Sequence, residues 1–337
     1  MAITGTGTQN DPFVVHGYDE FISLSEHAAV ENSSVYIKFF DEPNQTINCN
    51  SYGSEFKWGQ FKANRDVTVY IDLNGCTIKN VLIDANKAMF YAVGGNDTYP
   101  HWHAAVIKIS NGSFLNVFVS DASSRIAQGQ VEFSNVAIST NTSSATTIPI
   151  QGVASDKPCK IDNCALYWQH ATLSTALMKF CTVTDTDFEL HIDDQNNNPM
   201  FSDCSYTDCR FQGKISGRAY RNSINEDAVV LGYNIGTGGY SQSHRVILTN
   251  CVADLDLTDS YGTPNYYGRN YYIYNTYNDA SLNTNVFCNS HYPSAGTTYQ
   301  YNYSTAWNYM PHEGNDGKNI RNGAYLNSKG FVVVQVS

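Results

Sequence analysis

The chain has 337 residues, of which 42% are hydrophobic and 15% charged, and its formal net charge at pH 7 is -11. This acidic excess, with no run rich in Lys and Arg, argues against a nucleic-acid-binding protein, whose affinity comes largely from neutralised phosphates. The first twelve residues (MAITGTGTQNDP) lack the features of a signal peptide, and no apolar stretch is long enough to span a bilayer. We therefore expect a folded protein made in the cytoplasm, with no membrane partner, whose nine cysteines are thiols.

The first predicted element is a short amphipathic helix in residues 19–29 (DEFISLSEHAA). Phe21, Leu24, Ala28 and Ala29 share one helical face, and the segment VYIKFF that follows predicts a strand. A repeat protein needs such an element to cover the apolar end of its first repeat. We interpret the helix as a cap.

A six-residue pattern then recurs along the chain, with a small or apolar first residue, an apolar or aromatic third residue and a small sixth residue. The fifth residue is Asn or Asp in seven copies and Gly in one. The copies are IDLNGC (71–76), CTIKNV (76–81), GSFLNV (112–117), VEFSNV (131–136), CKIDNC (159–164), CTVTDT (181–186), CSYTDC (204–209) and VILTNC (246–251).

The fifth position of this pattern predicts a sharp corner. Residues one and three of a strand share a face, and residue six returns to that face only if the chain turns between them. Asn, Asp and Gly tolerate the left-handed backbone that such a turn requires. After the corner, apolar and polar residues alternate, as in Phe188, Leu190 and Ile192 against Asp187, Glu189 and His191.

The spacing of these corners predicts the fold class. From Val117 onward the sixth residues are separated by 19, 28, 22, 23 and 42 residues, the last close to two periods of 21. Short strands repeated at this interval indicate a solenoid in which each coil buries its apolar side against the next. We predict an all-β protein built as a single-stranded parallel β-helix. A leucine-rich repeat would need Leu-rich helical units, and a β-sandwich would lack the fixed corner.

The region after residue 257 has a different composition. Residues 261–309 contain 12 of the 24 tyrosines together with many Asn, Gly, Ser and Thr, and GFVVVQVS at the end predicts a closing strand. Clustered tyrosines suit a recognition surface and a subunit interface equally well. The candidate interaction residues are Tyr266, Tyr267, Tyr271, Tyr272, Tyr274 and Tyr277. We divide the chain into an N-terminal docking and capping segment (1–50), the β-helix (51–257) and this Tyr/Asn-rich β region (258–337).

With these corners and this cap, the chain resembles the right-handed parallel β-helix proteins of bacteriophage virions, such as tailspikes, head fibres and capsid decoration proteins. The segments GTGTQNDPFVV (5–15), DEFISLSEHAA and IDLNGCTIKNV (71–81) carry the resemblance, which covers roughly residues 1–257. The resemblance implies the right hand of the helix, a homotrimer, docking on other virion proteins through the N-terminal segment and a place on the virion surface.

The cysteines do not predict a metal site. Cys159 and Cys164, like Cys204 and Cys209, have a C-x4-C spacing, but Val and Thr occupy the same columns of the repeat in other copies. A thiolate metal site would not accept Val, so we expect buried thiols and no metal or cofactor. His101 and His103 form an H-x-H pair that would need a third ligand, and none can be named.

Asp187, Glu189 and His191 are the candidate catalytic residues. Residues i and i+2 of a strand lie near 7 Å apart, within the range that glycoside cleavage requires of two carboxyl groups. Asp187 is equally suited to an ordinary cross-strand pair with Arg210 on the next coil. Asp254 is expected about three coils, roughly 14 Å, from Glu189, which is too far for joint catalysis.

These observations favour a non-enzymatic structural protein of a bacteriophage virion, displayed as a rigid β-helix from the capsid or the tail. The competing interpretation is a tailspike depolymerase, a glycoside hydrolase or polysaccharide lyase that uses Asp187, Glu189 and His191. A third is a non-catalytic adhesin that binds a host surface glycan. A carboxylate pair in an aromatic cleft would indicate the enzyme, whereas acids matched to bases would indicate the scaffold.

Overall fold

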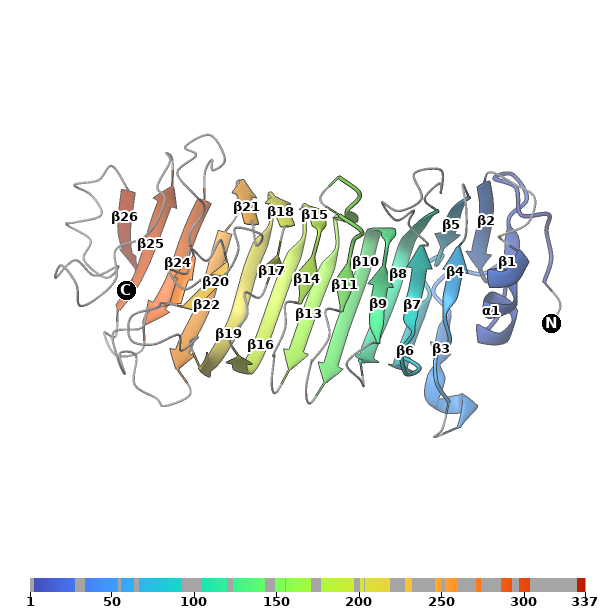
Figure 1. Ribbon diagram of the computed structural model, residues 1–337, viewed down its shortest axis with the longest axis horizontal. Helices are drawn as coiled ribbons and strands as arrows, with labels where there is room; N and C mark the ends of the chain where they lie inside the picture. Colours follow the sequence, from blue (N-terminus) through green and yellow to red (C-terminus); the bar gives the residue numbers. More distant parts are fainter. Residues whose placement is uncertain are drawn as a thin grey trace. The chain divides into compact units, whose positions relative to one another are not determined.

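The computed structural model describes residues 3–27, 34–53, 56–63, 67–92, 105–119, 124–142, 149–154, 156–170, 177–196, 201–202, 204–218, 228–231, 246–249, 252–259, 271–273, 286–292, 297–303 and 332–336. These residues form one α-helix, α1 (Tyr18–His27), one 3-10 turn, η1 (Cys49–Tyr52), and many short strands, so the described chain is all-β (Figure 1). The expected helix is present as α1 and the strand after it as β2, while Ala28 and Ala29 of the predicted apolar face lie outside the described residues.

The first half of the chain contributes β1 (Phe13–Val15), β2 (Ser34–Phe39), β3 (Thr46–Asn48), β4 (Phe61–Ala63), β5 (Thr68–Asp72), β6 (Thr77–Leu82), β7 (Ala88–Ala92), β8 (Val106–Phe118), β9 (Arg125–Gln128), β10 (Gln130–Thr142), β11 (Ile150–Gln151), β12 (Cys159–Asp162) and β13 (Ala165–His170). The second half contributes β14 (Met178–Lys179), β15 (Cys181–Thr184), β16 (Asp187–Asn196), β17 (Phe201–Ser202), β18 (Cys204–Thr207), β19 (Arg210–Arg218), β20 (Ala228–Leu231), β21 (Val246–Thr249), β22 (Val252–Asp259), β23 (Tyr271–Ile273), β24 (Val286–Tyr292), β25 (Thr297–Tyr303) and β26 (Val332–Val336).

The chain divides into two compact units. Unit 1 comprises residues 1–167 and 180–182, and unit 2 comprises residues 168–179 and 183–337. Each is described by itself below. The functional division into segments 1–50, 51–257 and 258–337 stays a prediction.

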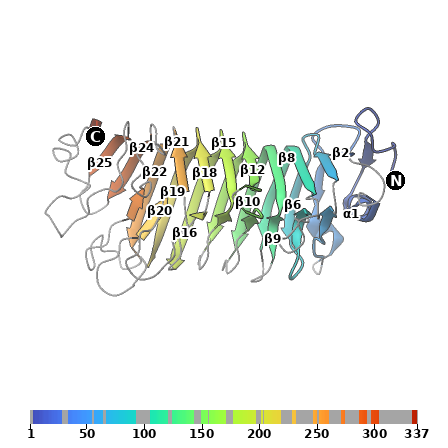
Figure 2. The same ribbon diagram turned by 45° about the horizontal axis from the view of Figure 1, so that its top comes forward.

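Unit 1 is built from strands that pair in parallel with their counterparts one repeat later. One row of pairs runs β1, β2, β5, β8, β10 and β12, and it uses the first halves of β8 and β10 (Figures 1 and 2). A second row runs β3, β6 and the second halves of β8 and β10. A third runs β4, β7, β9 and β11. Each repeat therefore adds a strand to three rows of parallel pairs.

The corner residues have the predicted left-handed backbone. Position five has a positive φ in each of the seven copies whose corner is described, from Gly75 (76°) and Asn80 (60°) to Asp208 (55°). Asn250, the corner of the last copy, lies outside the described residues. The prediction that this position is a tight turn is confirmed for these seven copies.

The single repeat column predicted from the sequence was wrong, because it merged two corners. Asn116 lies level with Asn80 in the pairing of β8 with β6, whereas Asn135 lies level with Asn111 in the pairing of β10 with β8. Asn111 and Asn116 are both left-handed and both belong to β8. The 13-residue strand thus contains two corners, and the repeat interval between Asn111 and Asn135 is 24 residues.

Asparagine side chains connect the corners of successive repeats. At one corner, Asn80 Nδ2 donates to Asn48 Oδ1 (2.8 Å) and Asn116 Nδ2 donates to Asn80 Oδ1 (2.7 Å). At the other corner, Asn111, Asn135 and Asn163 form a similar row, in which Asn135 Nδ2 donates to Asn111 Oδ1 (3.3 Å). Each side-chain amide thus forms a hydrogen bond with the amide of a neighbouring repeat, while the backbone of the same residue forms the corner.

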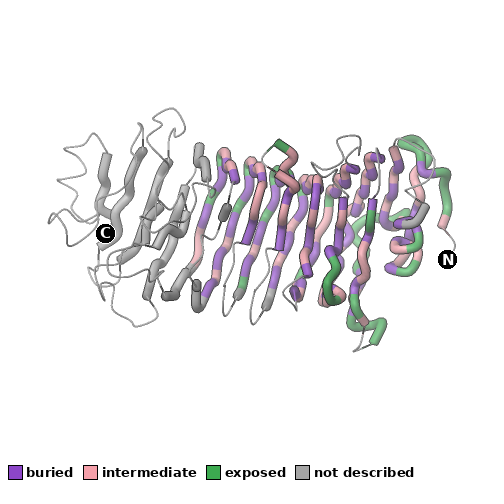
Figure 3. The backbone as a smooth tube through the Cα atoms, viewed as in Figure 1, coloured by how far each residue is buried: buried purple, intermediate pink, exposed green. Residues whose placement is uncertain are grey.

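The interior of unit 1 is apolar and continuous along the strands, and inward and outward residues alternate (Figure 3). β2 and β5 each show this alternation along their length. At the N-terminal end, Phe21 of α1 is fully buried and its ring stacks on Phe61, with ring centroids 4.7 Å apart. Phe39 and Trp58 lie against the same ring. The contacts of Phe21 confirm that the helix covers core residues at this end.

In unit 2, β16, β19, β22 and β24 pair in parallel, as do β14 with β17, β18 with β21, and β20 with β23. β18 and β21 pair directly, although their corner copies are 42 residues apart in the sequence. The expectation of two periods in this interval is therefore wrong, because it contains one repeat with a long insertion. β24, β25 and β26 are antiparallel, and β26 is the predicted closing strand.

Candidate functional site

The predicted catalytic residues lie on the outward side of β16. Phe188 and Leu190 between them are fully buried, so Asp187, Glu189 and His191 share the opposite side of the strand. Glu189 Oε1 lies 2.9 Å from His191 Nε2, and the two side chains are 44% and 39% exposed. Glu189 can therefore accept a hydrogen bond from His191 on its own strand.

The neighbouring strand β19 places a polar or basic residue beside each of them. Asp187 is level with Arg210, as expected, Glu189 with Gln212, and His191 with Lys214. Carboxylates that face basic or amide neighbours across a parallel pair form an ordinary surface ladder. The arrangement gives each acid its own cross-strand neighbour, while Asp187 and Glu189 remain an i and i+2 pair about 7 Å apart on the same side of β16.

The distance expected for Asp254 needs a correction. Glu189 pairs with Gln212, and Gln212 pairs with Asp254, so Asp254 is two strands from Glu189 and not three. At the usual spacing between strands this separation is about 10 Å. This backbone separation lies at the upper limit of the range of about 6.5 to 9.5 Å typical of the two carboxyl groups of inverting glycosidases, so it does not support the expectation that Asp254 is too far from Glu189.

Two of the candidate interaction tyrosines lie on a described strand. Tyr271 and Tyr272 belong to β23 and pair with Ala228 and Val229 of β20. Tyr266, Tyr267, Tyr274 and Tyr277 lie outside the described residues. Their role in an interface stays a prediction.

The cysteines whose side chains are described are buried thiols. Cys159, Cys164, Cys181, Cys204 and Cys209 are all buried, and so are Cys49 and Cys76. Burial raises the pKa of Cys49 to about 12 and the pKa of Cys76 to about 11. The prediction of core thiols is confirmed for these residues, and Cys251 lies outside the described ones.

No group of three or more His, Cys, Asp or Glu side chains that could hold a metal ion occurs among the described residues. His101 and His103 lie outside them. In the same part of the chain, no helix is long and apolar enough to cross a membrane.

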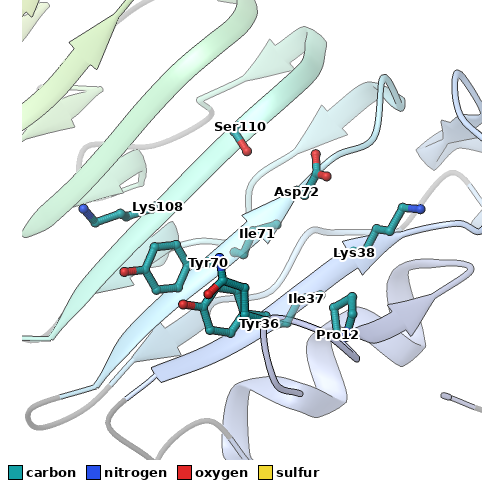
Figure 4. Close-up of a pocket in the computed structure, with 10 residues that line it drawn as sticks. Pro12, Tyr36, Ile37, Lys38, Tyr70, Ile71, Asp72, Lys108 and Ser110 are labelled. Atoms are coloured by element: carbon teal, nitrogen blue, oxygen red, sulfur yellow. The ribbon is translucent and has the colours of Figure 1, made fainter. Parts of the chain in front are cut away.

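A pocket that the sequence did not predict lies on the outward side of the first row of strands in unit 1 (Figure 4). It has a volume of about 180 Å³. β2, β5 and β8 supply most of its lining residues, and Gln9 and Pro12 of the N-terminal segment also line it. The remaining lining residues are Tyr36, Ile37, Lys38, Tyr70, Ile71, Asp72, Lys108 and Ser110.

Two stacked tyrosines line this pocket. Tyr36 and Tyr70 are level in the pairing of β2 with β5, and their rings lie 4.4 Å apart between centroids at an angle of 3°. Lys108, level with Tyr70 on β8, places its Nζ 5.8 Å from the centroid of the Tyr70 ring. Desolvation and the neighbouring Tyr70 raise the pKa of Tyr36. The repeated tripeptide Val-Tyr-Ile (35–37 and 69–71) was the sequence signal for this stack.

The row continues beyond Lys108 as a line of alternating charges. Glu132 lies 2.9 Å from Lys108 Nζ and 2.9 Å from Lys160 Nζ. Partial burial opposes ionisation of Glu132, but hydrogen bonds from the two lysines outweigh it and lower the pKa of this carboxyl. The hydrogen bond to Glu132 likewise raises the pKa of Lys108, although burial partly offsets it. Lys108 is therefore stabilised in its charged form by its ion pair with Glu132.

Asp72, Lys38 and Ser110 are level with one another on the three strands and form a second polar row at the pocket. Asp72 Oδ1 accepts hydrogen bonds from the backbone amide of Asn74 (2.9 Å) and from Asn111 Nδ2 (3.1 Å). A carboxylate accepts about four hydrogen bonds. Asp72 is thus fixed in orientation and keeps capacity for a ligand.

No protein-family model matches the chain, and comparison with curated proteins finds no match.

Proposed function

We propose that this chain is a right-handed parallel β-helix that serves as a non-enzymatic structural protein of a bacteriophage virion. It acts as a rigid, trimeric scaffold on the virion surface, displayed from the capsid or the tail. The observation that carries this proposal is the register of unit 1, where each repeat pairs in parallel with the next along three rows and its corners are connected through side-chain amides.

The pairing supports a β-helix. β5 pairs with β8 in parallel, and the chain between them passes through β6 and β7, which pair with β8 and β9 of the following repeat. A parallel crossover of this kind is right-handed in about 98% of cases, which supports the right hand that the resemblance implies. A coil held along three sides has little freedom to bend, which suits a scaffold.

The placement of the acids also favours the scaffold over the enzyme. Asp187 and Glu189 have Arg210 and Gln212 as their cross-strand neighbours, and Glu189 also contacts His191. Their spacing of about 7 Å would suit the two acids of a glycosidase, so it is the matched neighbours and not the distance that favours the scaffold. The proposal therefore assigns no chemistry to these residues.

The first experiment tests the place and assembly of the protein. Antibodies against the purified chain should label intact phage particles in electron micrographs, and light scattering should give the mass of three copies. Replacement of Tyr271, Tyr272 and Tyr274 by Ala should reduce the trimer, because aromatic clusters carry a large share of contact energy. A monomeric chain that is absent from the particle would refute the proposal.

A second experiment separates the scaffold from a depolymerase. The double change Asp187→Asn and Glu189→Gln should leave phage infectivity unchanged, and the wild-type protein should release no reducing ends from host surface polysaccharide. Asp208→Asn, at an exposed corner of the same unit, is the matched control. Cleavage that the double change abolishes and the control preserves would establish the enzyme, because each carboxyl supplies a separate chemical step.

A further inference from the structure

We propose that the N-terminal strap, residues 3–12, covers a strand edge of β1 and β2 that would otherwise pair with the same edge of a second copy of the chain. The strap contains most of the segment GTGTQNDPFVV (5–15), which the scaffold function leaves without a structural role. The inference concerns unit 1 alone and needs no virion. The two proposals can therefore fail independently.

The first row of strands in unit 1 begins with a strand that is shorter than its neighbour. β1 has three residues and is level with residues 37–39 of β2, which begins at Ser34. Tyr36 on β2 thus lies beyond the start of β1, and β1 has an outer edge of its own. Unpaired N–H and C=O groups at such an edge form a template for a strand of another chain.

The strap accepts hydrogen bonds from both strands at this edge. The N–H of Val14, the middle residue of β1, donates to the carbonyl oxygen of Thr4 at 2.9 Å in an isolated antiparallel bridge. The N–H of Tyr36 donates to the carbonyl oxygen of Gly7 at 2.9 Å. The backbone donors that Val14 and Tyr36 present here are thus occupied by the same chain.

The strap does not replace the covered edge with a new strand. Thr6 N–H and Thr8 N–H each donate to the carbonyl oxygen of Asp11 at 3.1 Å, and Asp11 N–H donates to that of Thr8 at 3.2 Å. These hydrogen bonds fold the strap into a compact loop. Gly5 and Gly7 have φ values of 85° and 76°, which lie outside the range of an extended strand. A second chain therefore meets a loop at this edge.

Glycine is required at both of these positions. A Cβ on Gly5 would collide with the carbonyl oxygen of Pro12, and a Cβ on Gly7 would collide with the ring of Phe13. The first obstacle is backbone, and the second belongs to β1. Larger residues at positions 5 and 7 should therefore displace the strap, while every core side chain remains in place.

The other two rows are protected at the same end by different means. In the third row, the backbone N–H of Lys62 in β4 donates to Ser25 Oγ of α1 at 2.8 Å. The second row begins with β3, which has only three residues and follows Glu42 and Pro43. Short strands, charged residues and proline are common protections of a sheet edge. The strap supplies the protection of the remaining row.

The test replaces Gly5 and Gly7 by Val in the full chain and measures particle mass by light scattering over a range of protein concentrations. Two copies of one edge can pair about a twofold axis, so the mass of the double variant should rise by about twofold and then stop. The wild-type mass should show no such rise. Asn10→Val is the matched control, because it places the same side chain at an exposed position of the strap, and it should behave as the wild type.

Two further measurements separate edge pairing from a folding defect. At low protein concentration, the backbone amides of residues 13–15 and 34–39 should exchange hydrogen faster in the double variant than in the wild type. Val14→Pro, added to the double variant, removes an N–H that points away from β2 and should restore the wild-type mass. The proposal is overturned if exchange is not faster, if the mass stays at the wild-type value or grows without limit, or if Val14→Pro does not restore it.

Discussion

At the scale of single residues, each corner asparagine has two roles, one for its backbone and one for its side chain. Their backbone adopts a left-handed conformation that costs most residues about 1 to 2 kcal/mol. Their side chains meanwhile donate to the preceding repeat and accept from the next, as Asn135 does between Asn111 and Asn163. Asp satisfies the first requirement but lacks the donor nitrogen, and Gly lacks the side chain.

Asn135 separates these two tasks experimentally. Asn135→Gly should destabilise the fold modestly, because it loses two hydrogen bonds worth about 1 kcal/mol each but keeps a permitted backbone. Asn135→Val should cost about 1 to 2 kcal/mol more, since it also strains the left-handed turn. Urea unfolding measures both free energies. Equal losses from Gly and Val would contradict the corner assignment.

At the scale of elements, α1 stabilises the structure by filling the end of the core. Its contribution comes from an aromatic cluster in which the buried Phe21 ring contacts Phe39, Trp58 and Phe61. Ser25 adds a hydrogen bond, because its Oγ accepts from the Lys62 backbone amide at 2.8 Å. A short helix with these contacts depends on tertiary packing and not on its own helical propensity.

Phe21→Ala tests this dependence. The change should lower the free energy of unfolding by about 3 to 5 kcal/mol, because it leaves a cavity among large rings. Ser23→Ala, on an exposed position of the same helix, should change it by less than about 0.5 kcal/mol. Chemical denaturation of both variants gives the comparison. A Phe21→Ala protein as stable as wild type would show that the helix is not a cap.

The same scale shows what the sequence could and could not predict. Position five was predictable, because left-handed backbone restricts residue type so strongly that Asn163 or Asp208 reveals its turn locally. The two rows of corners could not be told apart from the sequence, because a six-residue pattern does not show which strand it pairs with. The Tyr36–Tyr70 stack depends on register across 34 residues, which the repeated tripeptide Val-Tyr-Ile indicates only when the two distant segments are compared.

At the scale of the whole molecule, buried thiols make stability depend on pH in the alkaline range. Burial raises the pKa of Cys49 to about 12, and those of Cys76 and Cys164 to about 11, from a usual value of 9.0. Below pH 9 these thiols are protonated in both folded and unfolded chains. Above it only the unfolded chain ionises them, so stability is lost as the pH rises toward 11 to 12.

The corresponding measurement is urea unfolding at about pH 8 and about pH 10.5. The wild-type chain should lose stability between the two. A variant with Cys49→Val, Cys76→Val and Cys164→Val should lose less, because it has no thiol to ionise at these positions, while its tyrosines and lysines titrate as before. Identical losses in the two proteins would show that these thiols are not buried as described.

The row of corner amides that ends at Asp72 also has a direction. Asn163 donates to Asn135, Asn135 to Asn111, and Asn111 to Asp72, whose ionised carboxylate can only accept. The carboxylate therefore fixes the orientation of every amide behind it, and the aligned dipoles polarise one another along the row. Replacement of Asp72 by a residue without an acceptor would remove the group that sets this direction, so its effect on the amides would extend to Asn163, three repeats away.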